Sequence, residues 1–202
     1  MLKTQIFPDF ITIDGAEGGT GAAPFEFSNH LGTPCLEAVY YINHVLIGLN
    51  IRNRMRLIAS GKTTSGFDMI TKISLGADTV NAARSMMLAL GCLQSRSCNT
   101  NMCPTGIATQ NPFRSKAVNV EEKHLRVAIY HARTVQSFMD LCGAMGYDHP
   151  DNLLPSDIYR RFDQGLFHFD DIYTPLRVGQ LLKDDIPKIY AVDWQKASAK
   201  SF

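Results

Sequence analysis

Short apolar runs alternate with longer segments of helical periodicity in the first half of the chain. The runs are rich in β-branched and apolar residues and are bounded by glycine or polar residues, which predicts strands at 9–14, 55–60 and 78–83. Helices are predicted at 35–54, 67–77 and 84–91, and Gly76 is expected to end the second of them. Strands that alternate with helices favour a parallel sheet whose strands are covered on both faces.

The second half of the chain has a different pattern. Residues 121–147 place apolar side chains at steps of three and four, which predicts one long amphipathic helix able to dock on a partner surface. Ser156 is expected to cap a short helix within 153–162. Beyond residue 162 the signals weaken, so 163–202 is predicted to be a helical tail without chemistry.

Composition and charge narrow the class of protein. A chain of 202 residues, 45% hydrophobic and 19% charged, can bury one core, as a single domain or as part of a larger one. The net charge of +1 and the scattered basic residues argue against a nucleic-acid partner. No apolar run reaches the roughly 20 residues of a membrane span, so no membrane span is predicted and the cytoplasm is the expected compartment.

Three of the five cysteines lie close together, at Cys92, Cys98 and Cys103. Bunched thiols disfavour a secreted disulfide framework. Three thiolates suit an iron–sulfur cluster with one open corner, and Cys103 is followed by proline, as in ferredoxin cluster motifs. Structural zinc requires a fourth ligand, from Cys35 or Cys142 on another element. Three neighbouring cysteines without a metal are the third interpretation.

Loops at the ends of the predicted strands carry candidate ligand-binding residues. The strand predicted at 55–60 ends at the small residues Ser60 and Gly61, so backbone N–H groups there can approach a phosphate. Lys62 and Arg84 are the cations that could contact the same phosphate. Such loops also form plain turns. The denser loop 15–24 permits close backbone approach to a ligand and is interpreted either as the floor of an active site or as a connector.

Four segments together carry a family resemblance: "ITIDGAEGGTGAAP", "RLIASGKTTSGFD", "LGADTVNAARSMMLALGC" and "CNTNMCPTGIATQ". They resemble the FMN-binding synthase domain of glutamate synthase, nearest to stand-alone FMN-binding glutamate synthase family proteins. The match runs from about residue 7 to 162. The resemblance implies the C-terminal part of a (β/α)8 TIM barrel, about its last three βα units, over 1–162, with the cysteine segment at 91–110 and an extension over 163–202.

The same resemblance implies the cofactors and their ligands. Cys92, Cys98 and Cys103 are implied as ligands of a [3Fe-4S] cluster. The implied FMN-binding residues are Gly18, Gly19, Thr20, Ser60, Gly61, Lys62, Ala82, Ala83 and Arg84, and Glu17 is the implied catalytic residue. The family's chemistry passes electrons through the cluster to FMN for the reductive amination of 2-oxoglutarate to glutamate, an oxidoreductase activity on CH-NH2 donors in glutamate biosynthesis. The implied partners are 2-oxoglutarate, ammonia or glutamine-derived ammonia, and a donor such as ferredoxin or a reductase subunit.

The chain departs from the family at several places. Ala16-Glu17 stands where the large-subunit enzymes have a His-Asp pair, and Ser60-Gly61-Lys62 stands where they have Asp-Gly-Gly, as fits the stand-alone relatives. Only three of eight barrel strands are recognisable, which leaves strand edges unpaired. We therefore expect a truncated product or one half of a split enzyme, completed by a polypeptide that supplies the missing strands.

Two other interpretations stay open at the level of sequence. A non-catalytic iron–sulfur or zinc-binding subunit would dock through the helix at 121–147 and would bind metal without flavin. A related FMN-dependent barrel oxidoreductase, of the hydroxyacid oxidase or nucleotide dehydrogenase kind, would share the phosphate loops but would leave the three cysteines unexplained.

Overall fold

The computed structural model describes residues 1–17, 21–183 and 185–200. Its strands are β1 (Phe10–Ile13), β2 (Arg56–Ala59), β3 (Thr79–Val80), β4 (Tyr159–Phe162) and β5 (Gly165–His168). Its α-helices are α1 (Phe25–Asn29), α2 (Cys35–Gly48), α3 (Gly66–Ser74), α4 (Arg84–Leu90), α5 (Pro112–Ser115), α6 (Val120–Ala144), α7 (Phe169–Ile172) and α8 (Lys188–Lys196). No helix in these ranges is long and apolar enough to cross a membrane.

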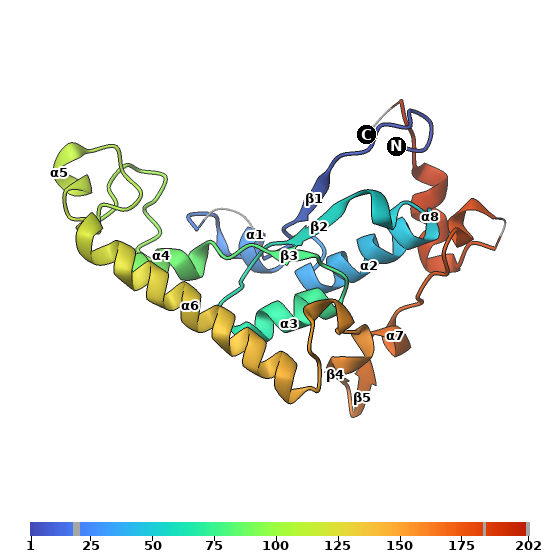
Figure 1. Cartoon of the computed structure of the whole chain (residues 1–202). Helices are drawn as coiled ribbons and strands as arrows, with labels where there is room; N and C mark the ends of the chain where they lie inside the picture. Colours follow the sequence, from blue (N-terminus) through green and yellow to red (C-terminus); the bar gives the residue numbers. More distant parts are fainter. Residues whose placement is uncertain (18–20, 184, 201–202) are drawn as a thin grey trace.

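The first three strands form one parallel sheet in the order β1-β2-β3, as the alternating pattern predicts. Ile11 pairs with Leu57 and Ile13 with Ala59, so these side chains share one face of the sheet. Helices α2 and α3 cover that face, where Leu57 and Ala59 are fully buried (Figure 1). The protein is therefore an α/β protein with a parallel sheet.

In the described part of the chain, strand β1 carries exposed side chains on the opposite face of the sheet, contrary to the expectation that helices would cover both faces. Phe10, on that face, exposes 57% of its surface, and Thr12 is also exposed. Helices α2 and α3 both pack on the side of Leu57 and Ala59, an arrangement compatible with the outer helices of a partial barrel. The side chains of the uncovered face are those that would point into a barrel.

The predicted helices exist, with shorter bounds. Helix α2 ends at Gly48 instead of residue 54, because Asn50 adopts a positive φ of 55° and 52–54 form a single 3-10 turn. Gly76 ends α3 with a φ of +109°, as predicted. The strand predicted at 78–83 is limited to Thr79–Val80.

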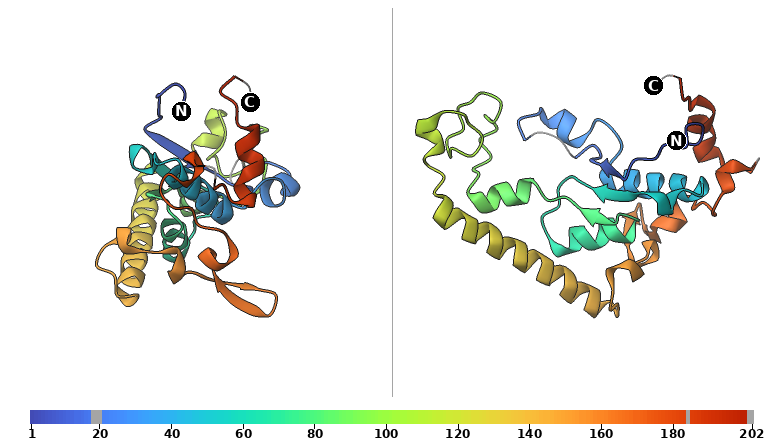
Figure 2. Two further views of the ribbon diagram at one scale, coloured as in Figure 1. Left: turned by 90° about the vertical axis from the view of Figure 1, so that its right-hand side faces the viewer. Right: turned by 45° about the horizontal axis from the view of Figure 1, so that its top comes forward.

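The long helix α6 crosses one side of the molecule, and α3 and α4 pack along it (Figures 1 and 2). Only Phe138 and Cys142 of α6 are buried. Leu125 and Met139, which belong to its predicted apolar face, expose 54% and 44% of their surface. The contact with α3 is close at Gly66, where a Cβ atom would lie 2.6 Å from the backbone nitrogen of Phe138.

The expectation of a short helix capped by Ser156 was wrong. Residues 155–157 form one 3-10 turn, and 159–168 form the antiparallel hairpin β4–β5. Asp163, with a φ of 52°, turns the chain between the two strands, and strand pairing competes with the helix that the capping signal favoured. The region beyond 162 is therefore not purely helical, and the predicted boundary between 162 and 163 stays a prediction.

The C-terminal region packs on the outer side of α2 through specific contacts. Tyr40 donates a hydrogen bond to Asp170 (2.7 Å), and Tyr41 donates one to Asp193 on α8 (2.8 Å). His44 Nδ1 accepts the backbone N–H of Leu176 at 3.1 Å, and only 7% of this histidine is exposed. These contacts anchor the region to α2.

Buried His44 makes stability depend on pH. Burial lowers the pKa of His44, and the charge of Asp170 only partly offsets this. Since the folded-state pKa lies below the unfolded value of about 6.5, the stability contributed by neutral His44 is complete above that pH and is lost as pH falls through the folded pKa. We expect His44→Asn, which keeps an acceptor for Leu176 but does not titrate, to lose less stability between pH 8 and pH 5.5 than the wild type, by on the order of 1 kcal/mol. Urea unfolding measures this difference, and equal losses would contradict it.

Candidate functional site

The loop after β1 contacts the start of helix α2. Glu17 Oε2 accepts the backbone N–H of Cys35, the first residue of α2, at 2.7 Å, so this carboxylate caps the helix where a negative charge is favourable. Gly15 has a φ of +66°, and a Cβ atom there would lie 2.4 Å from the Cα atom of Cys35. The catalytic role of Glu17 stays a prediction.

Three of the predicted flavin-binding residues, Gly18, Gly19 and Thr20, lie outside the described residues. The next group follows β2. The Ser60 N–H donates to the carbonyl of Ile13 at 2.8 Å, and Lys62 Nζ donates to Asn29 Oδ1 at 2.6 Å. Gly61 and Lys62 both have positive φ angles, of 102° and 45°, which turn the chain sharply at the carboxyl end of the strand.

The turn after β3 borders a cavity of about 320 Å³. Ala82 is half-buried, Ala83 is the N-terminal cap of α4 and Arg84 is its first residue. Ala83 and Arg84 line the cavity together with Cys92 and Cys98. Predicted flavin-binding and cluster-binding residues therefore meet at one cavity.

Glu17, Gly61 and Lys62 line a second cavity, of about 230 Å³. Asn29 connects the two, because it lines the first cavity and accepts the hydrogen bond of Lys62. Both cavities lie at the carboxyl ends of the parallel strands, where α/β proteins place their ligands.

Arg96 links the cysteine segment to the N-terminal loop, a contact that the sequence did not reveal. Its guanidinium lies 3.7 Å from the centre of the Phe25 ring and donates a hydrogen bond to the carbonyl of Ala23. Both Arg96 and Phe25 line the larger cavity. Arg96 and Ala23 are 73 residues apart in the sequence, so no local pattern indicates this contact.

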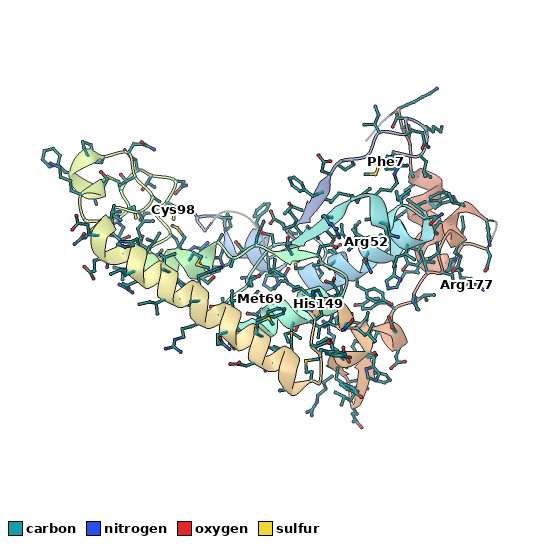
Figure 3. All side chains as sticks on the ribbon, in the orientation of Figure 1. Phe7, Arg52, Met69, Cys98, His149 and Arg177 are labelled. Carbon is teal, nitrogen blue, oxygen red and sulfur yellow. The ribbon has the colours of Figure 1, made fainter. Side chains whose placement is uncertain are left out.

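The cysteine segment follows α4 and precedes α6 in the chain, and Cys98 lies far from Arg52, which precedes β2 (Figure 3). Cys92 Sγ accepts the N–H of Gln94 at 3.4 Å. The hydroxyl of Thr105 lies 3.4 Å from Cys103 Sγ. Together with the backbone N–H groups of residues 105, 107 and 108, it lowers the pKa of Cys103 to about 7.

The donor chemistry of this segment fits an iron–sulfur cluster. Cys92, Cys98 and Cys103 are free thiols on one loop, and N–H groups directed at sulfur are typical of cluster sites. Within the part of the chain that the structure describes, no three His, Cys, Asp or Glu side chains are grouped to hold a metal ion. Cluster binding therefore requires the loop to draw the three thiols together.

A family model described as a conserved region in glutamate synthase matches residues 2–148. The glutamate synthase large subunit-like protein YerD of Bacillus subtilis is 37% identical over 173 residues, which cover 85% of this chain and 33% of YerD. The archaeal glutamate synthase (NADPH) of Methanocaldococcus jannaschii is 37% identical over 145 residues, 72% of this chain and 28% of that protein. The ferredoxin-dependent glutamate synthase 2 of Synechocystis is 33% identical over 147 residues, 72% of this chain and 9% of that protein. The chain spans about a third or less of the length of these relatives.

Proposed function

The chain belongs to the glutamate synthase family, and on that premise we propose that it contributes the flavin and iron–sulfur part of a glutamate synthase-like oxidoreductase. The proposed reaction is the reductive amination of 2-oxoglutarate to glutamate. The observation that carries the proposal is the cavity at which Ala83 and Arg84 meet Cys92 and Cys98. It supports a flavin site next to a cluster site.

Cys92, Cys98 and Cys103 would hold a [3Fe-4S] cluster. The lowered pKa of Cys103 favours the thiolate that metal binding requires. The contact of Arg96 with Phe25 holds the cysteine segment against the N-terminal loop, so the cluster loop and the predicted flavin loop stay adjacent. When bound, the cluster and FMN supply single-electron transfer and hydride transfer, respectively.

The backbone of the strand ends would hold the FMN phosphate. Ser60, Gly61 and Lys62 follow β2, while Ala82, Ala83 and Arg84 follow β3, and these adjacent loops match the usual phosphate position in a (β/α)8 barrel. Gly18, Gly19 and Thr20 would lie near the flavin or substrate. Glu17 would keep its cap on α2 and thereby fix the start of that loop.

We further propose that strands from another polypeptide segment complete the barrel. The outer edges of β1 and β3 have no strand partner in the described parts of the chain, and Phe10 is exposed on the face that would point into a barrel. The edge of an unpaired strand exposes backbone N–H and C=O groups that can pair with another strand. The names of the relatives include both NADPH and ferredoxin, so the proposed donor is a ferredoxin or a reductase subunit, and the proposed compartment is the cytoplasm.

Anaerobic purification followed by an absorption spectrum and assays of iron, zinc and flavin on one sample tests the proposal. Flavin together with about three irons per chain, as a three-iron cluster requires, would support it. Iron without flavin would favour the alternative of a non-catalytic iron–sulfur subunit, which the exposed apolar face of α6 also favours. Zinc alone, or neither metal nor flavin after co-expression with the remaining barrel strands, would refute the redox proposal.

A further inference from the structure

A third cavity, lined by tyrosine side chains, belongs to none of the proposed cofactor sites. It has a volume of about 390 Å³ and lies between α2 and α8, which are joined by the hydrogen bond from Tyr41 to Asp193 (Figure 1). Part of its lining comes from 173–193, beyond the residues that the family model matches. The tyrosines that line this tyrosine cavity are Tyr40, Tyr41, Tyr173 and Tyr190.

Most of these tyrosine hydroxyls already donate their protons to other groups. The hydroxyl of Tyr41 donates to Asp193 at 2.8 Å. The hydroxyl of Tyr190 donates to a backbone carbonyl at 2.9 Å, and that of Tyr40 donates to Asp170. A hydroxyl that has donated its proton still offers an acceptor oxygen, and the face of a tyrosine ring attracts cations. The tyrosine cavity therefore favours a ligand that donates hydrogen bonds and carries positive charge.

Asp193 supplies a negative charge that has no cationic partner in the described part of the chain. Its Oδ2 accepts the hydroxyl of Tyr41, a neutral group. None of the ion pairs among the described residues includes Asp193, although Lys196 lies in the same last turn of α8. Because the carboxyl end of a helix carries a partial negative charge, a carboxylate there is stabilised by a cation beside it.

The other charged residue of the cavity is already paired. The side chain of Glu37 is 13% exposed and forms an ion pair with Arg160 of β4. Arg160 does not line the tyrosine cavity, and no Lys, Arg or His is found among its described lining residues. The lining therefore carries the negative charge of Asp193 without a compensating cation, which disfavours an anionic ligand.

We propose that the tyrosine cavity binds a primary alkylammonium, whose N–H groups donate to Asp193 and to tyrosine hydroxyl oxygens. One carboxylate without a cationic partner matches one positive charge. Ile189, 48% exposed, and the stacked rings of Tyr41 and Tyr190, 5.0 Å apart, offer an apolar surface to the alkyl chain. A quaternary ammonium has no N–H group to donate, so a primary ammonium fits these acceptors better.

n-Butylammonium chloride is the probe for a test on the full chain. Trp194, the one tryptophan of the chain, follows Asp193 and packs against the apolar cluster that contains Tyr190, so its fluorescence reports on this cavity. We expect a saturable fluorescence change with butylammonium. Sodium chloride at equal ionic strength should give none, and 1-butanol, which has the same alkyl chain without the charge, should bind more weakly.

Asp193→Asn is the variant that tests the role of the charge. It keeps an acceptor for the hydroxyl of Tyr41 but removes the negative charge, so the butylammonium dissociation constant should rise by about fivefold, the upper range for an ion pair near the surface. Asp163→Asn is the matched control, because Asp163 is exposed in the β4–β5 turn, outside the cavity, and asparagine tolerates its positive φ. This control should bind butylammonium as the wild type does.

The proposal fails if butanol binds as tightly as butylammonium, if tetramethylammonium binds more tightly, or if Asp193→Asn keeps the dissociation constant of Asp163→Asn. Isothermal titration calorimetry on the same variants gives a second measurement that does not rely on Trp194. Neither heat nor a fluorescence change with butylammonium would also reject the site. Neither readout depends on flavin or iron, so rejection of this site would leave the proposed oxidoreductase function untouched.

Discussion

Replacement of Cys98 by alanine is expected to lower the iron content of the anaerobically purified chain by at least about tenfold. A three-iron cluster with one open corner relies on three thiolates, so the loss of one ligand leaves too few to hold it, and even changes beside the ligands weaken metal binding by 10–100-fold. Cys98 lies at the cavity that also contains Arg84, so its removal should also disturb the neighbouring flavin site. Iron, sulfide and flavin per chain are the quantities to measure.

Cys142→Ala is the matched control for this prediction. Cys142 is 1% exposed in the hydrophobic core, and it is not one of the three proposed cluster ligands. This variant should retain the iron of the wild type, whereas Cys92→Ala and Cys103→Ala should behave like Cys98→Ala. Iron retained by Cys98→Ala, or iron lost equally from Cys142→Ala, would show that the cysteine segment is not the cluster site.

Local patterns predicted the parallel sheet and its helices correctly because each signal lies within one element. The apolar run at 55–60 produced β2, and Gly76 ended α3 because a left-handed residue terminates a helix. The hairpin at 159–168 was missed, since all four residues of β4 are exposed and give no alternation of apolar and polar positions. The one available turn signal was the Asp-Gln-Gly sequence at 163–165.

The candidate site was less predictable because it depends on contacts between distant residues. The motif residues Ala83, Arg84, Cys92 and Cys98 do meet at one cavity. No pattern indicated that Glu17 would cap a helix 18 residues later, or that Lys72 would be buried instead of solvated. Periodicity places a side chain on a face of its own helix, but the charge that faces it is set by tertiary packing.

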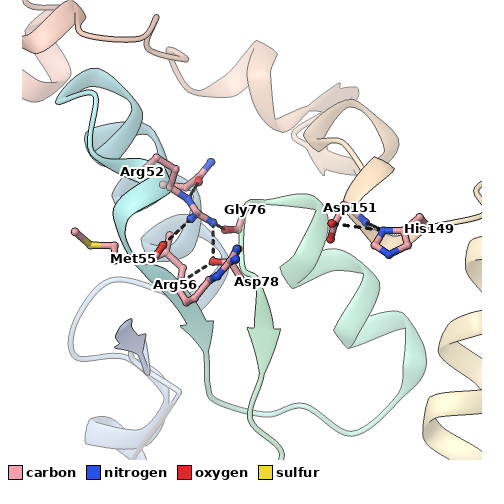
Figure 4. A network of polar contacts seen from close by, with 9 residues as sticks. Arg52, Met55, Arg56, Gly76, Asp78, His149 and Asp151 are labelled. Atoms are coloured by element: carbon pink, nitrogen blue, oxygen red, sulfur yellow. Dashed lines mark hydrogen bonds and ion pairs between the residues drawn. The ribbon is translucent and has the colours of Figure 1, made fainter. Parts of the chain in front are cut away.

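Asp78→Ala is expected to lower the free energy of unfolding by about 3 kcal/mol. Asp78 Oδ2 accepts hydrogen bonds from Arg52 Nη2 (2.8 Å) and from the backbone N–H of Leu57 (2.7 Å), and Oδ1 accepts one from Arg56 (3.1 Å). Arg52 also donates to the carbonyls of Met55 and Gly76, so one cluster joins the amino ends of β2 and β3 (Figure 4). Removal of the carboxylate leaves the charge of the largely buried Arg52 without its ion-pair partner, and urea unfolding measures the loss of stability.

Arg56→Met is the control for this prediction. The side chain of Arg56 is 75% exposed, and an exposed ion pair contributes less than about 1 kcal/mol to stability.

The contribution of Asp78 to stability also depends on pH. Burial would raise the pKa of Asp78, but the hydrogen bond from Leu57 and the two arginines hold this pKa below its usual value. The stability that Asp78 contributes is therefore complete above the unfolded pKa of about 3.9 and is lost as pH falls through the folded pKa.

The Asp78 network lies at the end of the strands opposite the two cavities. In a (β/α)8 barrel, residues at that end stabilise the fold, whereas catalytic residues lie at the other end. Asp78→Ala should therefore unfold more easily yet bind iron as the wild type does, whereas Cys98→Ala should show the reverse. A loss of iron in folded Asp78→Ala would contradict this separation of the two ends.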